Sequence, residues 1–161
     1  VYKRQFEFIL EEAGRFCAAE LLPINRDGDE IGAILEDGQV STPPGFRQAY
    51  DAFCENGWIG LDADPEHGGQ GLPRLMKFLV DEMLCSCNLA FKLYAELSQG
   101  AYHLMNHAAP DELKAVCLPR MVEGTWSGTM CLTEPHCGTD LGLLTTRASK
   151  NDDGSYAISG T

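Results

Sequence analysis

The sequence is poor in positive charge. Its 161 residues include 12 Lys and Arg against 24 Asp and Glu, which gives a formal net charge of -12. Proteins that bind nucleic acid take much of their affinity from clustered Lys and Arg, and proteins that dock on anionic lipid use the same residues. The acidic balance therefore argues against a nucleic-acid partner and against a membrane-surface partner.

Long apolar runs and an ordered cysteine pattern are also missing. No stretch approaches the ~20 apolar residues of a membrane-spanning helix, and residues 1–5 show no signal-peptide pattern. The 7 cysteines have no repeated spacing, and most lie within apolar stretches. This is typical of reduced thiols that pack as small hydrophobic residues. We therefore expect a cytoplasmic protein without disulfides.

The first two thirds of the sequence have helical periodicity. Hydrophobic residues make up 44% of the chain, which is enough for a folded core. Residues 5–22 carry apolar side chains at the spacing of one helix face, and Pro23 ends the pattern. Residues 25–40 and the Gly-rich stretch 58–73 are expected to be loops. Four more helices are predicted from the same periodicity, over residues 43–57, 73–85, 89–107 and 111–121.

The pattern changes at Gly124. Residues 126–133 and 143–149 alternate as strands do, and a third strand is predicted over 155–159. Helices followed by strands, without alternation, indicate an α+β fold with separate α and β parts. We predict a helical domain over residues 1–123 and the start of a β-domain over residues 124–161. Because residues 156–161 resemble a strand that stops in mid-pattern, we expect the chain to be a fragment.

Two other patterns are weak candidates for chemistry. His103 and His107 have the spacing of metal ligands on a helix, but no third ligand is evident. Gly68-Gly69-Gln70-Gly71 has the glycines of a phosphate-binding loop without the preceding strand or the following Lys. A tight connection between two helices accounts for these glycines. We predict no metal site.

The stretch GTMCLTEPHCGTDLGLL, residues 128–144, is more specific. A predicted strand ends at Thr133, Glu134-Pro135 forces a turn, and Thr139 follows in the next loop. Free backbone groups and two hydroxyls at a strand end suit a flat polar ring system that is hydrogen-bonded along one edge. A β-turn would explain the turn residues, but it would not explain the whole string.

Residues 131–140, CLTEPHCGTD, resemble the C-x-T-E-P-x-x-G-S-D signature of the acyl-CoA dehydrogenase family. The helical region and the Gly-rich loop also fall where this family has them, so the resemblance covers nearly the whole chain. The strings TEPHCGTDLGLL and NLAFKLYAELSQGAYH are most like the branch that includes 3-methylmercaptopropionyl-CoA dehydrogenase. The resemblance implies an all-helical N-terminal domain followed by the first strands of a β-barrel-like middle domain.

The resemblance implies an oxidoreductase of fatty acid metabolism. Such an enzyme uses FAD to convert an acyl-CoA thioester, such as 3-methylmercaptopropionyl-CoA or a fatty acyl-CoA, to a 2-enoyl-CoA. Electrons then pass to electron-transfer flavoprotein, and the full-length protein is expected to be a homo-oligomer. The family's catalytic base is a Glu of a C-terminal domain, so no catalytic residue is expected in this chain, and Glu134 is interpreted as a structural carboxylate. An acyl-CoA oxidase and a non-catalytic relative that binds FAD or acyl-CoA stay open as alternatives.

The resemblance also implies binding residues. Two short stretches are expected to contact FAD, with the first along the flavin and the second at the pyrophosphate: Met130, Cys131, Leu132 and Thr133, then Gly138 and Thr139. Residues that are candidates for contact with the acyl-CoA substrate are Thr139, Tyr94, Leu97 and Ser98. The family usually has Ser at the position of Thr139, and it has Gly and Ala where this chain has His136 and Cys137.

Overall fold

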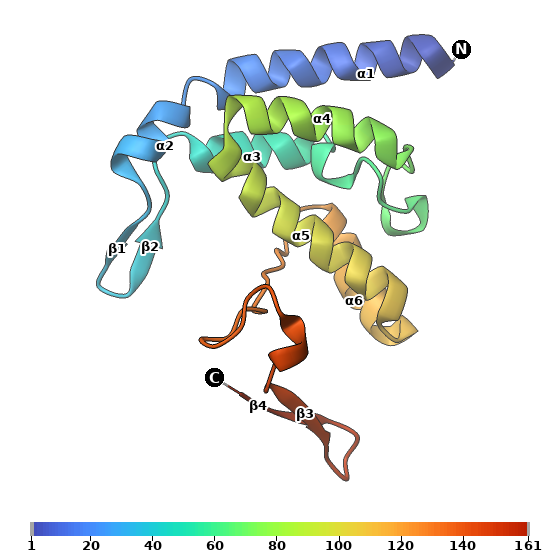
Figure 1. Cartoon of the computed structure of the whole chain (residues 1–161). Coiled ribbons are helices and arrows are strands. Elements are labelled where there is room, and N and C mark those ends of the chain that lie inside the picture. Colours follow the sequence, from blue (N-terminus) through green and yellow to red (C-terminus); the bar gives the residue numbers. More distant parts are fainter. Residues whose placement is uncertain (1, 161) are drawn as a thin grey trace. The chain divides into compact units, whose positions relative to one another are not determined.

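A computed structural model describes residues 2–160. The chain divides into two compact units, residues 1–129 and residues 130–161. The α-helices, labelled in Figure 1, are α1 (Tyr2–Phe16), α2 (Asn25–Ile31), α3 (Phe46–Glu55), α4 (Arg74–Cys87), α5 (Leu89–Ala108) and α6 (Asp111–Val122). A π-helical turn, η1 (Cys17–Leu21), continues α1, and the 3₁₀ turns are η2 (Trp58–Gly60), η3 (Pro65–His67) and η4 (Leu141–Leu143). The strands form two antiparallel hairpins: β1 (Ile34–Glu36) with β2 (Gln39–Ser41), and β3 (Arg147–Lys150) with β4 (Tyr156–Ser159).

The helical predictions for the first unit are confirmed, apart from one segment. The five predicted helices correspond to α1 with η1, and to α3, α4, α5 and α6. The expectation of a loop over residues 25–40 is wrong, because this stretch forms α2 and the β1–β2 hairpin. Asp37 and Gly38 make the hairpin turn with φ angles of 50° and 77°. Asp-Gly is a strong signal for a two-residue hairpin turn, and the sequence carries it between Leu35 and Val40.

The strands of the second unit differ more from expectation. Residues 126–133 were predicted to form a strand, which is wrong: they contain no strand within the described part of the chain. A strand needs a hydrogen-bonded neighbour, and residues 130–133 pair with none among residues 2–160. β3 begins at Arg147, later than predicted, since η4 occupies residues 141–143, and β4 confirms the strand at 155–159. Thr161, included in the interrupted strand, lies outside the described residues. The domain boundary at residues 123 and 124 stays a prediction, and the compact units meet at residues 129 and 130.

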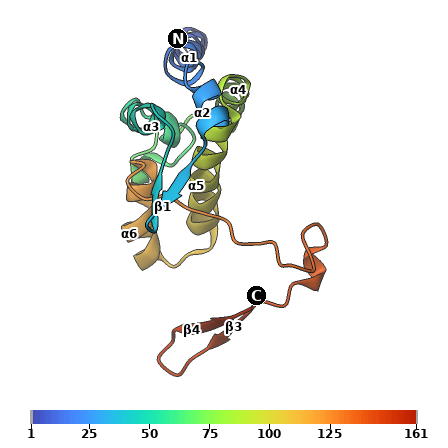
Figure 2. The same ribbon diagram turned by 90° about the vertical axis from the view of Figure 1, so that its left-hand side faces the viewer.

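The core of the first unit lies where α1, α3, α4 and α5 pack together. In Figure 2, α1, α3 and α4 are seen nearly end-on as neighbours. The rings of Phe53 on α3 and Phe91 on α5 meet edge to face with centroids 5.5 Å apart, an arrangement that adds to the stabilisation from burial alone. A second cluster joins α5 to α6 around Tyr102 and Leu118. The apolar faces read from the sequence are thus the faces that build this core.

Two polar features fix the connections between helices. Asn88 is buried between α4 and α5, where its side chain accepts a hydrogen bond from the Phe91 N–H at 3.0 Å and donates one to the Leu21 carbonyl at 3.3 Å. The Gly-rich loop folds back on the segment before it, since the Gln70 N–H donates to the Gly60 carbonyl at 2.9 Å. A Cβ atom on Gly69 would lie 2.1 Å from the Ala63 carbonyl oxygen, so this position requires glycine. The loop is therefore the tight helix connection that the sequence predicts. Across residues 2–160, none of the helices is both long enough and apolar enough to span a membrane.

Candidate functional site

The first part of the candidate site is residues 130–133, an exposed segment without regular secondary structure. Side chains of Met130 and Leu132 are 66% and 41% exposed. Within residues 2–160, the backbone N–H and C=O groups of this segment have no hydrogen-bond partner. Backbone groups are strong donors and acceptors that need a partner once they are covered. The segment therefore offers a row of free donors and acceptors next to apolar side chains, which is the chemistry that one edge of a flavin ring requires.

A tight turn follows this segment and reverses the chain. The Glu134 N–H donates to the Cys137 carbonyl at 2.9 Å, and the Cys137 N–H donates to the Glu134 carbonyl at 3.0 Å. The turn brings Gly138 next to Thr133, since a Cβ on Gly138 would be 3.5 Å from the Thr133 Cγ2. Thr139 is exposed beside it. The turn thus brings together the two stretches for which the family resemblance implies contact with the cofactor.

Glu134 is the anchor of the turn. Its side chain is only 4% exposed, and its carboxylate accepts hydrogen bonds from three donors: the Thr145 N–H at 3.0 Å, the Thr145 hydroxyl at 2.7 Å and the Thr146 N–H at 2.8 Å. Hydrogen bonds from Thr146 and then Thr145 lower the pKa of Glu134 to about 2, because they stabilise the ionised form. A carboxylate held in this way is a structural group, as the sequence analysis interprets it.

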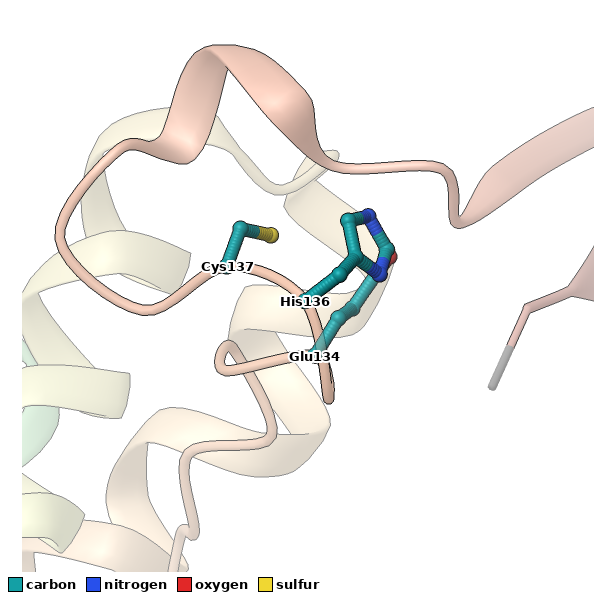
Figure 3. A group of neighbouring side chains, drawn as sticks. All are labelled: Glu134, His136 and Cys137. Atoms are coloured by element: carbon teal, nitrogen blue, oxygen red, sulfur yellow. The ribbon is translucent and has the colours of Figure 1, made fainter.

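The His136 side chain also holds this turn in place through its ring nitrogen. Its Nε2 lies 3.0 Å from the Leu143 carbonyl oxygen and 3.5 Å from Glu134 Oε2. The side chains of His136 and Glu134 lie next to each other in Figure 3. Cys137 is buried nearby, and the potential ligand atoms of Glu134, His136 and Cys137 all lie within 4.8 Å of one another. Both carboxylate oxygens already accept hydrogen bonds, and the imidazole Nε2 pairs with a carbonyl. We assign no metal ion to this cluster.

The candidate substrate residues of α5 differ in their environment. Tyr94 is 52% exposed, and its ring centroid lies 5.2 Å from that of Tyr50. Leu97 is exposed as well, whereas Ser98 is buried and its hydroxyl accepts a hydrogen bond from the Gly128 N–H at 3.1 Å. Tyr94 therefore offers a surface to a ligand, while Ser98 already has a structural partner.

An aromatic groove in the first unit includes Tyr94. It has a volume of about 880 Å³, and its aromatic lining comes from α3 and α5: Phe46, Tyr50, Phe91 and Tyr94. The Tyr50 hydroxyl donates to the Gly124 carbonyl at 3.1 Å, which fixes the groove wall against the end of α6. The sequence places Phe46 and Tyr50 on the inner side of a helix. It gave no signal that they border a groove.

The contacts of two further groups of residues were not predicted from the sequence. Thr145 and Thr146, the partners of Glu134, lie 11 and 12 residues after it, and no spacing rule connects a turn carboxylate with donors so far along the chain. The second group surrounds Asp62, whose Oδ2 lies 3.2 Å from His103 Nε2 and 3.7 Å from Arg74 Nε.

Comparison with known proteins shows relatives of similar sequence. The chain is 43% identical over 152 residues to 3-methylmercaptopropionyl-CoA dehydrogenase from Ruegeria pomeroyi. The match covers 94% of this chain and 26% of the relative. The chain thus spans about a quarter of that relative's length.

Solved structures show the same fold. The chain superimposes on butyryl-CoA dehydrogenase from Megasphaera elsdenii with a TM-score of 0.79 and 26% identity, covering 96% of this chain and 39% of that one. It also superimposes, with a TM-score of 0.77 and 22% identity, on an acyl-CoA dehydrogenase complexed with FAD from Bacillus anthracis, covering 98% of this chain and 25% of that one. The fold is therefore the helical region and the following small sheets of these enzymes. The sequence profile of the acyl-CoA dehydrogenase N-terminal domain matches residues 4–125, and the chain belongs to the acyl-CoA dehydrogenase family.

Proposed function

We propose that this chain is part of a flavin-dependent enzyme that oxidises an acyl-CoA thioester to a 2-enoyl-CoA. Family membership supports the reaction class, and the observation that carries the proposal is the free backbone edge of residues 130–133, closed by the turn that brings Gly138 to Thr133. The chain covers 26% of its relative from Ruegeria pomeroyi, so the activity belongs to the full-length protein. We place that protein in the cytoplasm as a homo-oligomer, with electron-transfer flavoprotein as its electron acceptor.

The residues of the second unit fit FAD. Bound flavin would supply the hydride acceptor, which is chemistry that protein side chains do not provide. Backbone N–H groups of Leu132 and Thr133, together with the Thr133 hydroxyl, would donate to the pyrimidine edge of the ring. Donors fixed at this edge stabilise negative charge that develops there during reduction. Gly138 and Thr139 would lie against the pyrophosphate, where the absence of a side chain at Gly138 permits close approach.

For the substrate we propose a saturated acyl-CoA, with 3-methylmercaptopropionyl-CoA as the first candidate because of the 43% identity to the relative of that name. Thr139 would contact the CoA portion, and Tyr94 and Leu97 would lie along the acyl chain. Thioether sulfur makes favourable contacts with aromatic rings, and Tyr94 with Tyr50 offers two of them. Ser98 is buried, and it would support this surface through the hydrogen bond that its hydroxyl accepts from the Gly128 N–H.

The test is a product assay on the natural full-length protein that contains this sequence. The protein is incubated with FAD, electron-transfer flavoprotein and either 3-methylmercaptopropionyl-CoA or straight-chain acyl-CoAs, and products are identified by mass spectrometry. The proposal predicts a product that has lost two hydrogen atoms, and more than one equivalent of product per bound flavin only when electron-transfer flavoprotein is present. Undiminished thioester in every reaction, with flavin bound, would contradict the proposed reaction.

A further inference from the structure

We propose that Glu134 is a positioning residue for the FAD-binding loop: by clasping Thr145 and Thr146, it holds Thr133 and Gly138 in the arrangement that receives the cofactor. This inference rests on the proposed function. The proposed role of Glu134 is to fix the residues on either side of it.

In the second unit, the clasp joins the turn at residues 134–137 to Thr145 and Thr146. Both oxygens of the carboxylate are used, since Oε1 accepts from the Thr146 N–H at 2.8 Å and Oε2 accepts from the Thr145 hydroxyl at 2.7 Å. The Thr145 N–H lies within hydrogen-bond distance of both oxygens. All three donors need an acceptor, so only an ionised carboxylate satisfies them together. A side-chain amide at this position would present an N–H group to at least one of these donors.

The effect of the clasp is transmitted to the cofactor residues by the turn. Glu134 and Cys137 are paired through both backbone hydrogen bonds, so fixing the Glu134 side chain also fixes the exit of the turn at Gly138. On the entry side, residues 130–133 have no backbone partner among residues 2–160, and Thr133 is held through its covalent link to Glu134. If such a segment is already ordered before the ligand binds, less conformational entropy is lost on binding.

His136 acts as a second fastening of the same kind. Its bond to the Leu143 carbonyl links the turn to the loop that leads directly into Thr145. Both fastenings therefore hold the turn against residues 143–146, just before β3 begins at Arg147.

The test measures FAD affinity in the full-length protein carrying Glu134→Gln, by titrating apoprotein with FAD and following flavin fluorescence. We expect the Kd for FAD to rise by about tenfold or more, because hydrogen bonds to a charged group are lost. Thr145→Val, which removes only the hydroxyl donor, is expected to raise Kd by about threefold. Thr145→Ser keeps that donor and is expected to restore the wild-type Kd.

The matched control is Asp153→Asn in the β3–β4 turn. Asp153 also accepts hydrogen bonds through its carboxylate, from the Ser155 N–H at 2.9 Å and the Ser155 hydroxyl at 2.6 Å, but it lies away from the cofactor loop in the chain. Its substitution is expected to leave Kd unchanged. Wild-type FAD affinity in Glu134→Gln and Thr145→Val, or an equal loss in Asp153→Asn, would overturn the positioning role. A wild-type protein that binds no FAD would overturn the proposed function itself.

Discussion

The Glu134 carboxylate carries an acid-sensitive contribution to folding. Its pKa is lowered from 4.5 to about 2 by hydrogen bonds from Thr146 and Thr145. A group with a lowered pKa in the folded state stabilises the fold above its unfolded pKa, and this stabilisation is lost as pH falls from 4.5 toward about 2. We therefore expect thermal unfolding of Glu134→Gln to depend less on pH in this window than unfolding of the wild type. The pKa of Asp153 is lowered as well. Because Asp153 is present in both the wild type and Glu134→Gln, the difference between their pH profiles reports on Glu134. Parallel pH profiles would contradict the prediction.

Cys17 and Cys85 are expected to differ in reactivity because one is buried and the other is exposed. Burial, and then the neighbouring Cys87, raise the pKa of Cys17 to about 12, whereas Cys85 is exposed on α4. Since the thiolate is the reactive form, Cys17 should resist alkylation in the native protein while Cys85 reacts, and both should react after denaturation. Peptide mass spectrometry after brief iodoacetamide treatment measures this. Native labelling of Cys17 that matches Cys85 would show that the core around η1 is open.

Substitution by Ala is predicted to have opposite effects on stability at Gly100 in helix α5 and at Gly69 in the Gly-rich loop. Gly100 is exposed on α5 and has open space around its Cα, so Gly100→Ala should stabilise the protein by about 1 kcal/mol through helix propensity. In Gly69→Ala, the new Cβ would meet the backbone of Ala63 at 2.1 Å, and the loop would have to move. We expect a loss of about 2 kcal/mol or more. Urea unfolding of both variants beside the wild type tests the pair, and equal effects would contradict the described loop.

The elements themselves were predictable where the signal is local. Helical periodicity and Pro23 were sufficient for α1 and η1, and Glu134-Pro135 indicated the turn. The Asp37-Gly38 hairpin was also readable from sequence, but the surrounding polar residues favoured a loop. Residues 126–133 have strand composition without a strand partner in the described chain, and pairing is a property of two segments. The contact of Glu134 with Thr145 depends in the same way on how two distant segments meet, so no local pattern reveals it.

At the scale of the whole molecule, the second unit leaves much apolar surface uncovered. Tyr156 and Ile158 on β4 are 59% and 76% exposed, and the two-stranded sheet β3–β4 has edges without a partner in residues 2–160. Exposed apolar strands of this kind favour association with other chains. We expect the isolated 161-residue chain to bind FAD weakly or not at all and to have no dehydrogenase activity. Equilibrium dialysis against FAD tests this, and full-length affinity in the isolated chain would contradict it.

The central claim is that the loop of residues 130–139 holds FAD in an enzyme that oxidises acyl-CoA thioesters. The most direct measurement is the visible spectrum of the natural full-length protein, recorded before and after anaerobic addition of a saturated acyl-CoA. The account predicts a yellow protein whose flavin absorbance is bleached by the thioester, because the substrate reduces the bound flavin. A colourless protein that added FAD cannot restore, or a yellow protein that no acyl-CoA bleaches, would contradict it.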